Sequence, residues 1–244
     1  MYEGHRQKLF ANDECHWWLK TKKDVVKKFL SIFAVDLRGK KILDAGCGTG
    51  FLSINLAPNL ANVYGVDSSG TSLEHARQRG LLHTICADLN KLPFNNNTFD
   101  VCFCMDVLEH NLEDQPLINE LGRVMCRGGI LIVTVPASPS LWGPQDDKLG
   151  HFRRYKKERL ANLFSKDFEI MKISYSLFSL FPAVFILRKF FKLFPKIMEE
   201  KDELDINNKF LNSILYKILK FEGGLLKYID YPAGVSLVAM ARKK

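Results

Sequence analysis

The chain of 244 residues has little of what marks membrane-spanning or secreted proteins. Its longest apolar candidate for a membrane segment, residues 177–187, contains Pro182 and ends at Arg188. A membrane-spanning helix needs about 20 apolar residues, so this segment is too short. The N-terminus also lacks the apolar core of a signal peptide. These absences predict a cytoplasmic protein.

Neither a Cys-x-x-Cys pair nor the spacing of a zinc site occurs among the six cysteines. Most of them lie in apolar runs, which predicts buried, reduced side chains. Cys102 and Cys104 are two residues apart and would face the same side of one strand. No linker rich in Gly, Ser or Pro and no internal repeat divides the chain. The sequence therefore predicts one domain with an elaboration.

Positive charge is in moderate excess, because the chain has 35 Lys and Arg against 27 Asp and Glu, a net charge of +8. A basic balance suits nucleic acid, anionic lipid or a phosphorylated small substrate. The lysines are dispersed, and neither an aromatic-basic RNA-binding motif nor an Asn-Pro-Pro-Tyr signature of base methylation occurs. Nucleic acid therefore ranks last of the three.

The most informative segment, residues 41–50, reads Lys-Ile-Leu-Asp-Ala-Gly-Cys-Gly-Thr-Gly, a strand that runs into a glycine-rich turn. Gly46, Gly48 and Gly50 let the backbone turn sharply and approach a ligand. A helix that begins near Phe51 would point its unpaired N–H groups at the same turn. Asp67 ends the next strand, where an acid meets ribose hydroxyls in strand-turn-helix-strand units. The glycine order is GxGxG and not the GxGxxG of dinucleotide sites.

This turn, opened by Asp44, resembles the first motif of class I S-adenosylmethionine (SAM) methyltransferases. Further points of resemblance are Asp88 after the third strand, Leu-Pro-Phe at 92–94, Phe-Asp at 99–100 and Leu-Glu-His at 108–110. The resemblance covers roughly residues 40–135. It implies SAM as cofactor and S-adenosylhomocysteine as product.

The resemblance also assigns roles at the cofactor site. It implies that Asp88 accepts a hydrogen bond from the adenine amino group, that the adenine packs on Leu89, and that the backbone at Asp106 borders the methionine part. The full set of cofactor residues expected is Asp44, Gly46, Gly48, Gly50, Asp67, Ser68, Asp88, Leu89 and Asp106.

Apolar strands alternate with helical segments, which predicts an α/β fold with a doubly wound, parallel sheet. The expected strands cover residues 41–45, 62–67, 82–86, 99–105, 129–135, 168–176 and 234–241, and the expected helices 50–58, 70–79, 113–126 and 156–164. The resemblance implies a Rossmann-like, seven-stranded methyltransferase sheet. Four parts are expected: an N-terminal helical segment or lid (1–38), a SAM-binding core (39–176), a helical insertion (177–231) and a final core strand (232–244).

The loop after the fifth strand contains Trp142 and the run Gly-His-Phe-Arg-Arg-Tyr at 150–155. With the segment around Trp18, it resembles a methyltransferase subgroup that often looks associated with polysaccharide or lipid-linked sugar metabolism. The acceptor residues expected are Trp18, Trp142, Arg153, Arg154 and Tyr155. The arginines suit a phosphate or carboxylate, and the alternative is a solvated charge pair. The N-terminal helix has lysines where the subgroup has arginines, so it lacks a planar anion clamp.

Methyl transfer requires an aligned acceptor, exclusion of water and, for a hydroxyl acceptor, removal of a proton. His110 and His151 are the candidate catalytic bases, because imidazole accepts a proton near neutral pH. The alternative for His110 is a capping or packing role. The cluster of Asp106, Glu109 and His110 resembles a Glu-x-x-Glu-His metal site of related methyltransferases, but its first acid is shorter. We expect no metal.

Six phenylalanines crowd residues 177–194 beside Arg188, Lys189 and Lys192. The segment is either a helical pair packed on the sheet, a homodimer interface, or an apolar surface with a basic rim that meets the inner face of a membrane. The sequence as a whole predicts a SAM-dependent methyltransferase that acts on a small or lipid-linked acceptor, with O-methylation favoured. The alternatives are a catalytically inactive SAM-binding partner subunit and a nicotinamide-dependent oxidoreductase on a similar fold.

Overall fold

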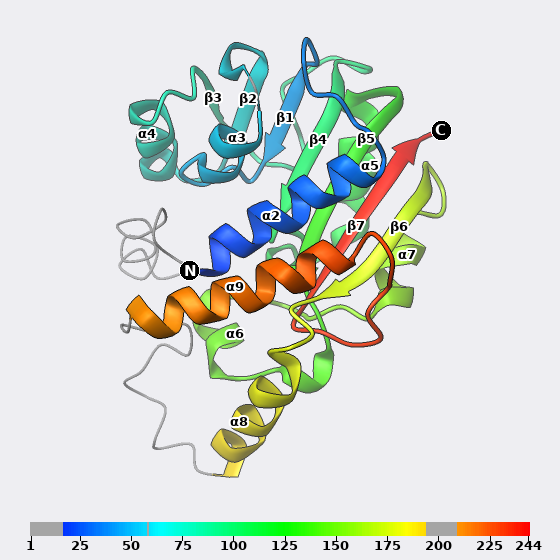
Figure 1. Cartoon of the computed structure of the whole chain (residues 1–244). Coiled ribbons are helices and arrows are strands. Elements are labelled where there is room, and N and C mark those ends of the chain that lie inside the picture. The colour runs from blue at the N-terminus through cyan, green and yellow to red at the C-terminus, as the bar shows by residue number, and fades with distance from the viewer. Residues whose placement is uncertain (1–16, 58, 194–208) are drawn as a thin grey trace.

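A computed structural model describes residues 17–57, 59–193 and 209–244. Seven strands form one sheet in the order β3-β2-β1-β4-β5-β7-β6 (Figure 1). The strands are β1 (Ile42–Ala45), β2 (Val63–Asp67), β3 (His83–Cys86), β4 (Phe99–Met105), β5 (Met125–Pro136), β6 (Phe168–Ser176) and β7 (Ser236–Lys243). The first five strands are parallel, and β7 is antiparallel to both β5 and β6. The expected seven-stranded sheet is confirmed.

The helices cover both faces of the sheet. They are α2 (Trp17–Ile32), α3 (Phe51–Leu56), α4 (Gly70–Gln78), α5 (Asp114–Val124), α6 (Pro144–Leu149), α7 (Lys157–Phe164), α8 (Phe181–Leu193) and α9 (Lys209–Leu225). Apolar residues of α5 and α7 join one core cluster, and those of α2 and α4 join another on the opposite face. Both faces of β4 are therefore apolar, and Cys102 and Cys104 point into the same core as expected.

The order of the strands reverses direction at β1, which lies between β2 and β4. In a doubly wound sheet, ligands bind outside the carboxyl ends of the strands at this switch point. Asp67 ends β2, and Asp106 directly follows β4. The fold therefore brings the glycine turn after β1 and these two acids to one edge of the sheet.

Most of the expected elements are confirmed to within a few residues, with three differences. The strand β5 begins at Met125, four residues before the expected bound. The helix α3 ends at Leu56, two residues before the expected bound. The segment after β5, expected to be a loop, contains the 3-10 helix η3 (Pro139–Leu141) and the short helix α6. Prolines stand at the start of both helices, where their missing N–H needs no partner.

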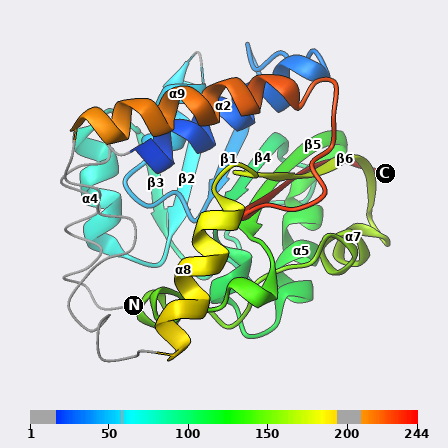
Figure 2. The same cartoon turned by 60° about the horizontal axis from the view of Figure 1, so that its bottom comes forward.

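The helical insertion between β6 and β7 returns to the N-terminal helix. Figures 1 and 2 show α9 running beside α2, and α8 standing apart from them. The Tyr216 hydroxyl of α9 donates to Asp24 of α2 at 2.6 Å. Buried Glu222 accepts from the backbone N–H groups of Phe178 and Ser179 at 2.7 and 2.8 Å. These contacts fix both ends of the insertion that the structure describes.

The expected lid segment 1–16 and residues 194–208 of the insertion lie outside the described residues. Within the described part of the chain, every helix is too short or too polar to cross a bilayer.

Candidate active site

The glycine turn after β1 adopts a conformation that favours residues without a Cβ. Gly46, Gly48 and Gly50 have φ angles of +75°, +52° and +74°. A Cβ on Gly46 would lie 2.3 Å from a methyl group of Val107, so the close approach of the two segments also requires glycine. The Gly46 N–H donates to the Val66 carbonyl at 2.7 Å. The turn is thus held against β2, and its three glycines form a cradle in which a ligand can approach the backbone.

Asp67 lies at the rim of this cradle and is 7% exposed. Its two carboxylate oxygens accept from the backbone N–H groups of Gly48 and Ser69, both at 2.9 Å. A carboxylate has about four lone-pair sites, so capacity remains for two ribose hydroxyls. Ser68, the next expected cofactor residue, is exposed.

Asp44 lies inside the protein at the end of β1 and is 2% exposed. It accepts a hydrogen bond from the Ser53 hydroxyl of α3. Burial raises the pKa of Asp44 to about 7, because an ionised carboxylate loses its hydration there. This side chain therefore ties the end of β1 to the helix after the turn.

Asp88 and Leu89 follow β3 at the same edge of the sheet. Asp88 is exposed, and its carboxylate accepts from the Asn90 backbone and side-chain amides at 2.9 and 3.1 Å. Leu89 is half-buried and packs on a core cluster. An exposed acceptor beside an apolar surface is the arrangement that the expected adenine contact requires.

Asp106, after β4, has a φ of +55°, which is uncommon for a residue with a side chain. One of its oxygens accepts from the Thr134 hydroxyl at 3.1 Å, and the other pairs with Lys22 of α2. Burial lowers the pKa of Lys22, which is 5% exposed. The Lys22 ammonium also lies 4.7 Å from the centre of a Trp18 ring.

Sequence reasoning missed Lys22. The absence of arginines in the N-terminal helix suggested that this helix holds no anion, yet one of its lysines is paired with Asp106. Lys22 lies four residues after Trp18, so the two side chains share a helix face, and that spacing was the available signal. Lys22 and Trp18 bring the N-terminal helix to the site.

On the acceptor side, the structure brings both candidate bases together. The ring centres of His110 and His151 are 4.8 Å apart. The Nδ1 atom of His151 lies 2.9 Å from a carboxylate oxygen of Asp146. Potential ligand atoms of Glu109, His110 and His151 all lie within 4.8 Å of one another. The sequence placed Glu109 and His110 on one segment and His151 on another, and the fold collects all three in one cluster.

Glu109 is buried within this cluster, and burial raises its pKa. Its buried Oε2 atom has no hydrogen-bond partner among the described residues. This cluster differs from the metal site of Asp106, Glu109 and His110 that was considered from the sequence. Asp106 is instead bonded to Lys22 and Thr134, and the third member of the cluster is His151. The chemistry of this donor set suits a divalent cation as well as proton transfer.

Asp146 of α6 organises the acceptor side and is fully buried. It accepts from His151 at 2.9 Å and from Arg154 and Arg188 at 2.8 Å each. Burial alone would raise its pKa, but the hydrogen bond from His151 and the charges of Arg154 and Arg188 outweigh burial and hold the pKa well below its ordinary value. Asp146 therefore stays ionised beside His151 at neutral pH.

The structure corrects the picture of the expected arginine-tyrosine acceptor site. Arg154 is buried and also donates to the Ala137 carbonyl at 3.1 Å. Tyr155 is 0% exposed, with its hydroxyl on Asp114 at 3.0 Å. Arg153 donates to the Asn111 carbonyl at 2.6 Å.

All three side chains thus brace the loop, because their polar atoms meet protein partners. From the sequence, Arg154 was expected either to bind an anionic acceptor or to form a solvated charge pair with Arg153. Its burial on Asp146 and the Ala137 carbonyl matches neither. Trp18 and Trp142 are half-buried, as an acceptor wall would require.

The cradle, Asp67 and the exposed edge after β3 fit an adenosyl group that is bound through a ribose. This fit rests on the close Gly46–Val107 approach and the carboxylate of Asp67. The residues that would hold SAM are those of the glycine turn with Asp67, Asp88 and Leu89.

Comparison with known proteins agrees with this assignment. A family model described as a methyltransferase domain matches residues 43–133. An uncharacterized protein of Methanocaldococcus jannaschii, MJ0638, is 32% identical over 183 residues, which cover 73% of this chain and 74% of that protein. A ubiquinone biosynthesis O-methyltransferase of Coxiella burnetii is 37% identical over 102 residues, 40% of this chain and 44% of the enzyme's own length.

Among solved structures, a SAM-dependent methyltransferase of Thermotoga maritima, described as a possible histamine N-methyltransferase, has the same fold. Its TM-score is 0.59 at 20% identity, over 98% of this chain and 99% of that one. The glycine turn lies within the residues that the family model matches. The chain belongs to the SAM-dependent methyltransferases, and SAM is its cofactor.

Proposed function

We propose that the protein methylates a hydroxyl group of a small or lipid-linked acceptor and that His151 is the base. The pairing of His151 with buried Asp146 at 2.9 Å carries this proposal. Because Asp146 stays ionised, it favours a proton on Nδ1 of His151 and leaves the lone pair on Nε2 to accept another. A carboxylate-oriented imidazole is suited to deprotonate a hydroxyl near neutral pH.

SAM, when bound, supplies a methyl group on a positively charged sulfur that is already activated for displacement. The remaining tasks belong to the chain. His151 would take the proton of the acceptor hydroxyl as the new oxygen–carbon bond forms and the sulfur–carbon bond breaks. Trp18 and Trp142 would exclude water from the acceptor, since both are half-buried at the ends of α2 and η3.

Two observations support the class of acceptor. The partial similarity to a ubiquinone biosynthesis O-methyltransferase favours transfer to oxygen. The net charge of +8 and the exposed apolar residues of α8 and α9 favour an acceptor attached to lipid. The proposed place of action is the inner face of a membrane, reached from the cytoplasm.

Metal-assisted O-methylation is the second candidate, favoured by the close approach of Glu109, His110 and His151. A divalent cation there would lower the pKa of a bound hydroxyl directly. Exhaustive dialysis against a chelator separates the two candidates. Turnover that is unchanged supports His151 as the base, and turnover that is lost and then restored by Mg²⁺ or Mn²⁺ supports the metal.

The central experiment follows the transfer of a labelled methyl group from SAM into separated lipid and aqueous fractions of a cell extract. We expect label in the lipid fraction, on oxygen, and loss of labelling with His151→Ala. Label on nitrogen or carbon would contradict O-methylation. SAM binding without transfer into any fraction would instead indicate a catalytically inactive partner subunit.

A further inference from the structure

The helix α8 exposes an apolar side that the fold does not use. Ile186 and Leu187 are 68% and 41% exposed, and exposed Phe190 follows at helical spacing. The opposite side of the helix faces inward, because Arg188 is buried and bonded to Asp146. One side of α8 therefore anchors the helix to the active site, and the other presents apolar side chains to the surroundings.

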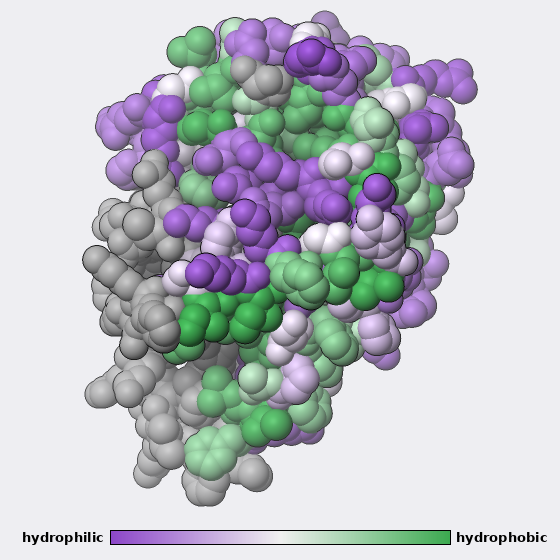
Figure 3. Space-filling view, in the orientation of Figure 1, coloured by the Kyte–Doolittle hydropathy of each residue, from purple (hydrophilic) through white to green (hydrophobic). Residues whose placement is uncertain are grey.

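The helix α9 has the same construction. Its inward side contains Leu219 and Glu222, which are buried. Its outer side carries Ile214, Ile218 and Phe221, which are 39%, 46% and 72% exposed and are spaced by four and three residues. Figure 3 shows apolar residues over α9 and on α8 in one view, next to a hydrophilic band along α2.

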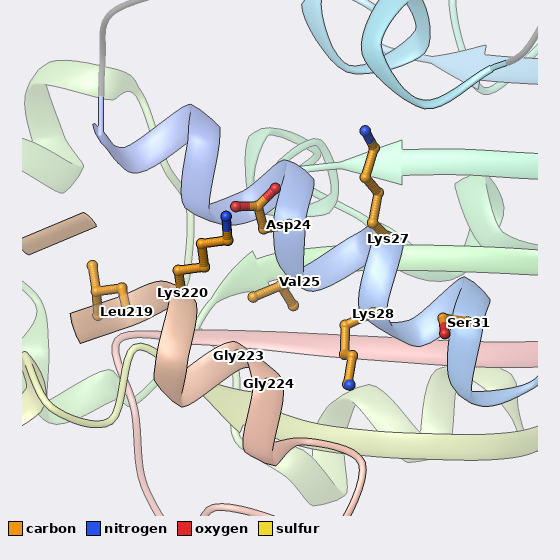
Figure 4. A pocket seen from close by; sticks show the side chains of 9 residues that line it. All are labelled: Asp24, Val25, Lys27, Lys28, Ser31, Leu219, Lys220, Gly223 and Gly224. Carbon is orange, nitrogen blue, oxygen red and sulfur yellow. The ribbon is translucent and has the colours of Figure 1, made fainter. Parts of the chain in front are cut away.

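Lysines flank this apolar surface. A groove of about 310 Å³ between α2 and α9 is lined by Lys27, Lys28 and Lys220, with Gly223 and Gly224 on one wall (Figure 4). Asp24 also lines this groove, but its carboxylate accepts from Tyr216 and lies 3.8 Å from Lys23. Lysine therefore dominates the rim.

Acidic groups are nearly absent from the two helices. The described sequences of α8 and α9 contain one acid, Glu222, which is buried on backbone N–H groups. Within these two described helices, the outer sides thus combine apolar and cationic groups, and the one acid is turned inward. This combination is complementary to a surface that is both apolar and anionic.

We propose that the outer sides of α8 and α9, together with the lysine groove, form a docking surface for an anionic lipid bilayer. The exposed residues would enter the boundary between head groups and acyl chains, and the lysines would lie at the level of the lipid phosphates. A second copy of the chain is a poorer partner, because a two-fold interface pairs the same patch with itself and would bring these lysines together.

Docking would also reach the reaction site. Arg188 connects the inward side of α8 to Asp146, and Asp146 holds His151. A bilayer in contact with the outer side of α8 would thus present a lipid-linked hydroxyl to His151. The inference deepens the proposed function, and it rests on that function only for the identity of the acceptor.

Flotation with lipid vesicles tests the surface directly. The wild-type protein should bind vesicles of equimolar phosphatidylglycerol and phosphatidylcholine, should not bind pure phosphatidylcholine, and should be released by salt. Ile186→Asp and Phe221→Asp should each weaken partitioning about tenfold or more. Leu82→Asp is the matched control, because Leu82 is 67% exposed on another part of the surface. It should bind like the wild type.

A charge test avoids the apolar residues altogether. Lys27→Glu with Lys220→Glu should also weaken partitioning about tenfold or more, since each lysine near the surface contributes about 1 kcal/mol. Lys91→Glu with Lys166→Glu changes the net charge equally at other exposed positions and should have a smaller effect. Phe185 is unsuitable for such tests because it is half-buried and stacks on Phe181.

Titration with SAM, done on every variant, separates the surface from the enzyme. Loss of vesicle binding with SAM affinity retained supports the surface. Wild-type protein that stays unbound at low salt, or that binds neutral and anionic vesicles equally, overturns it whether or not methyl transfer is found. A wild-type dimer that Phe221→Asp dissociates, without vesicle binding, would assign the surface to a second copy.

Discussion

On the cofactor side, most residues of the expected site come from one stretch between Asp44 and Asp106, and backbone groups make many of the contacts. On the acceptor side, Asp146 joins His151 and Arg154 to Arg188, which is 42 residues away. The cofactor side needs a tight turn, which glycine supplies locally. The acceptor side needs charges placed inside the protein, which only distant partners can stabilise. The two sides should therefore respond differently to substitution.

The largest effect is expected at His151. Its replacement by Ala should lower turnover by about 10²–10⁴ if it is the base, with SAM affinity unchanged. His110→Ala is the parallel variant, because the ring centre of His110 lies 4.8 Å from that of His151. We expect a smaller loss there. A loss confined to acceptor affinity in His151→Ala would make this residue a positioning group, and unchanged turnover would move the base to His110.

Asp146→Ala should have a nearly as large effect, but it should lower the stability of the fold and not only turnover. It leaves Arg154 and Arg188 buried without their carboxylate, which typically costs about 3–5 kcal/mol of unfolding free energy. Asp147→Ala changes the adjacent, exposed acid and should cost little. Chemical denaturation of both variants measures the difference. Equal stability of the two would show that the acceptor side does not depend on its buried charges.

Asp67 tests the cofactor side. Asp67→Ala should weaken SAM binding by about 1.5–3 kcal/mol, the range for a hydrogen bond to a charged group, and Asp67→Asn somewhat less. Turnover at saturating SAM should change far less than in His151→Ala. Isothermal titration gives the affinities. Unchanged affinity in both variants would remove Asp67 from the ribose site.

Stability should also depend on pH, with opposite signs on the two sides. Burial raises the pKa of Asp44 to about 7, so its folded state favours the proton. Stability from this group is complete below about pH 4 and falls between about pH 4 and 7, by at most about 1.4 kcal/mol per pH unit. The pKa of Asp146 is lowered, so its contribution is present above about pH 4 and is lost in acid.

Asp44→Asn should therefore flatten the stability profile between about pH 4 and 7, measured by denaturant titration at several pH values. If the stability of the wild type relative to Asp44→Asn rises between about pH 4 and 7, Asp44 is not protonated in the folded state. Asp44→Asn that leaves the profile unchanged would lead to the same conclusion.

The strands and most helix bounds were predictable because the apolar runs are long and the glycine turn is local. Asp67 was placed correctly at the end of β2 from spacing alone, since a strand-turn-helix-strand unit has a narrow range of lengths. Lys22 was missed because a helix sequence does not show which residue faces the sheet edge. Arg154 was expected to bind the acceptor, with a solvated charge pair as the alternative, and Arg188 was grouped with the basic residues beside the phenylalanines. Both are buried on Asp146. Nothing local in their sequences indicates a buried partner.

The sequence by itself determined the sheet and the glycine cradle, because periodicity, φ requirements and loop lengths act over a few residues. Its resemblance to a known family indicated the class of cofactor. Only the tertiary structure decided that His151 pairs with Asp146, which arginines turn inward and which sides of α8 and α9 remain exposed. Those choices depend on contacts between segments far apart in the chain. Burial of charge decides them, because an arginine inside the protein is stable only where a carboxylate meets it.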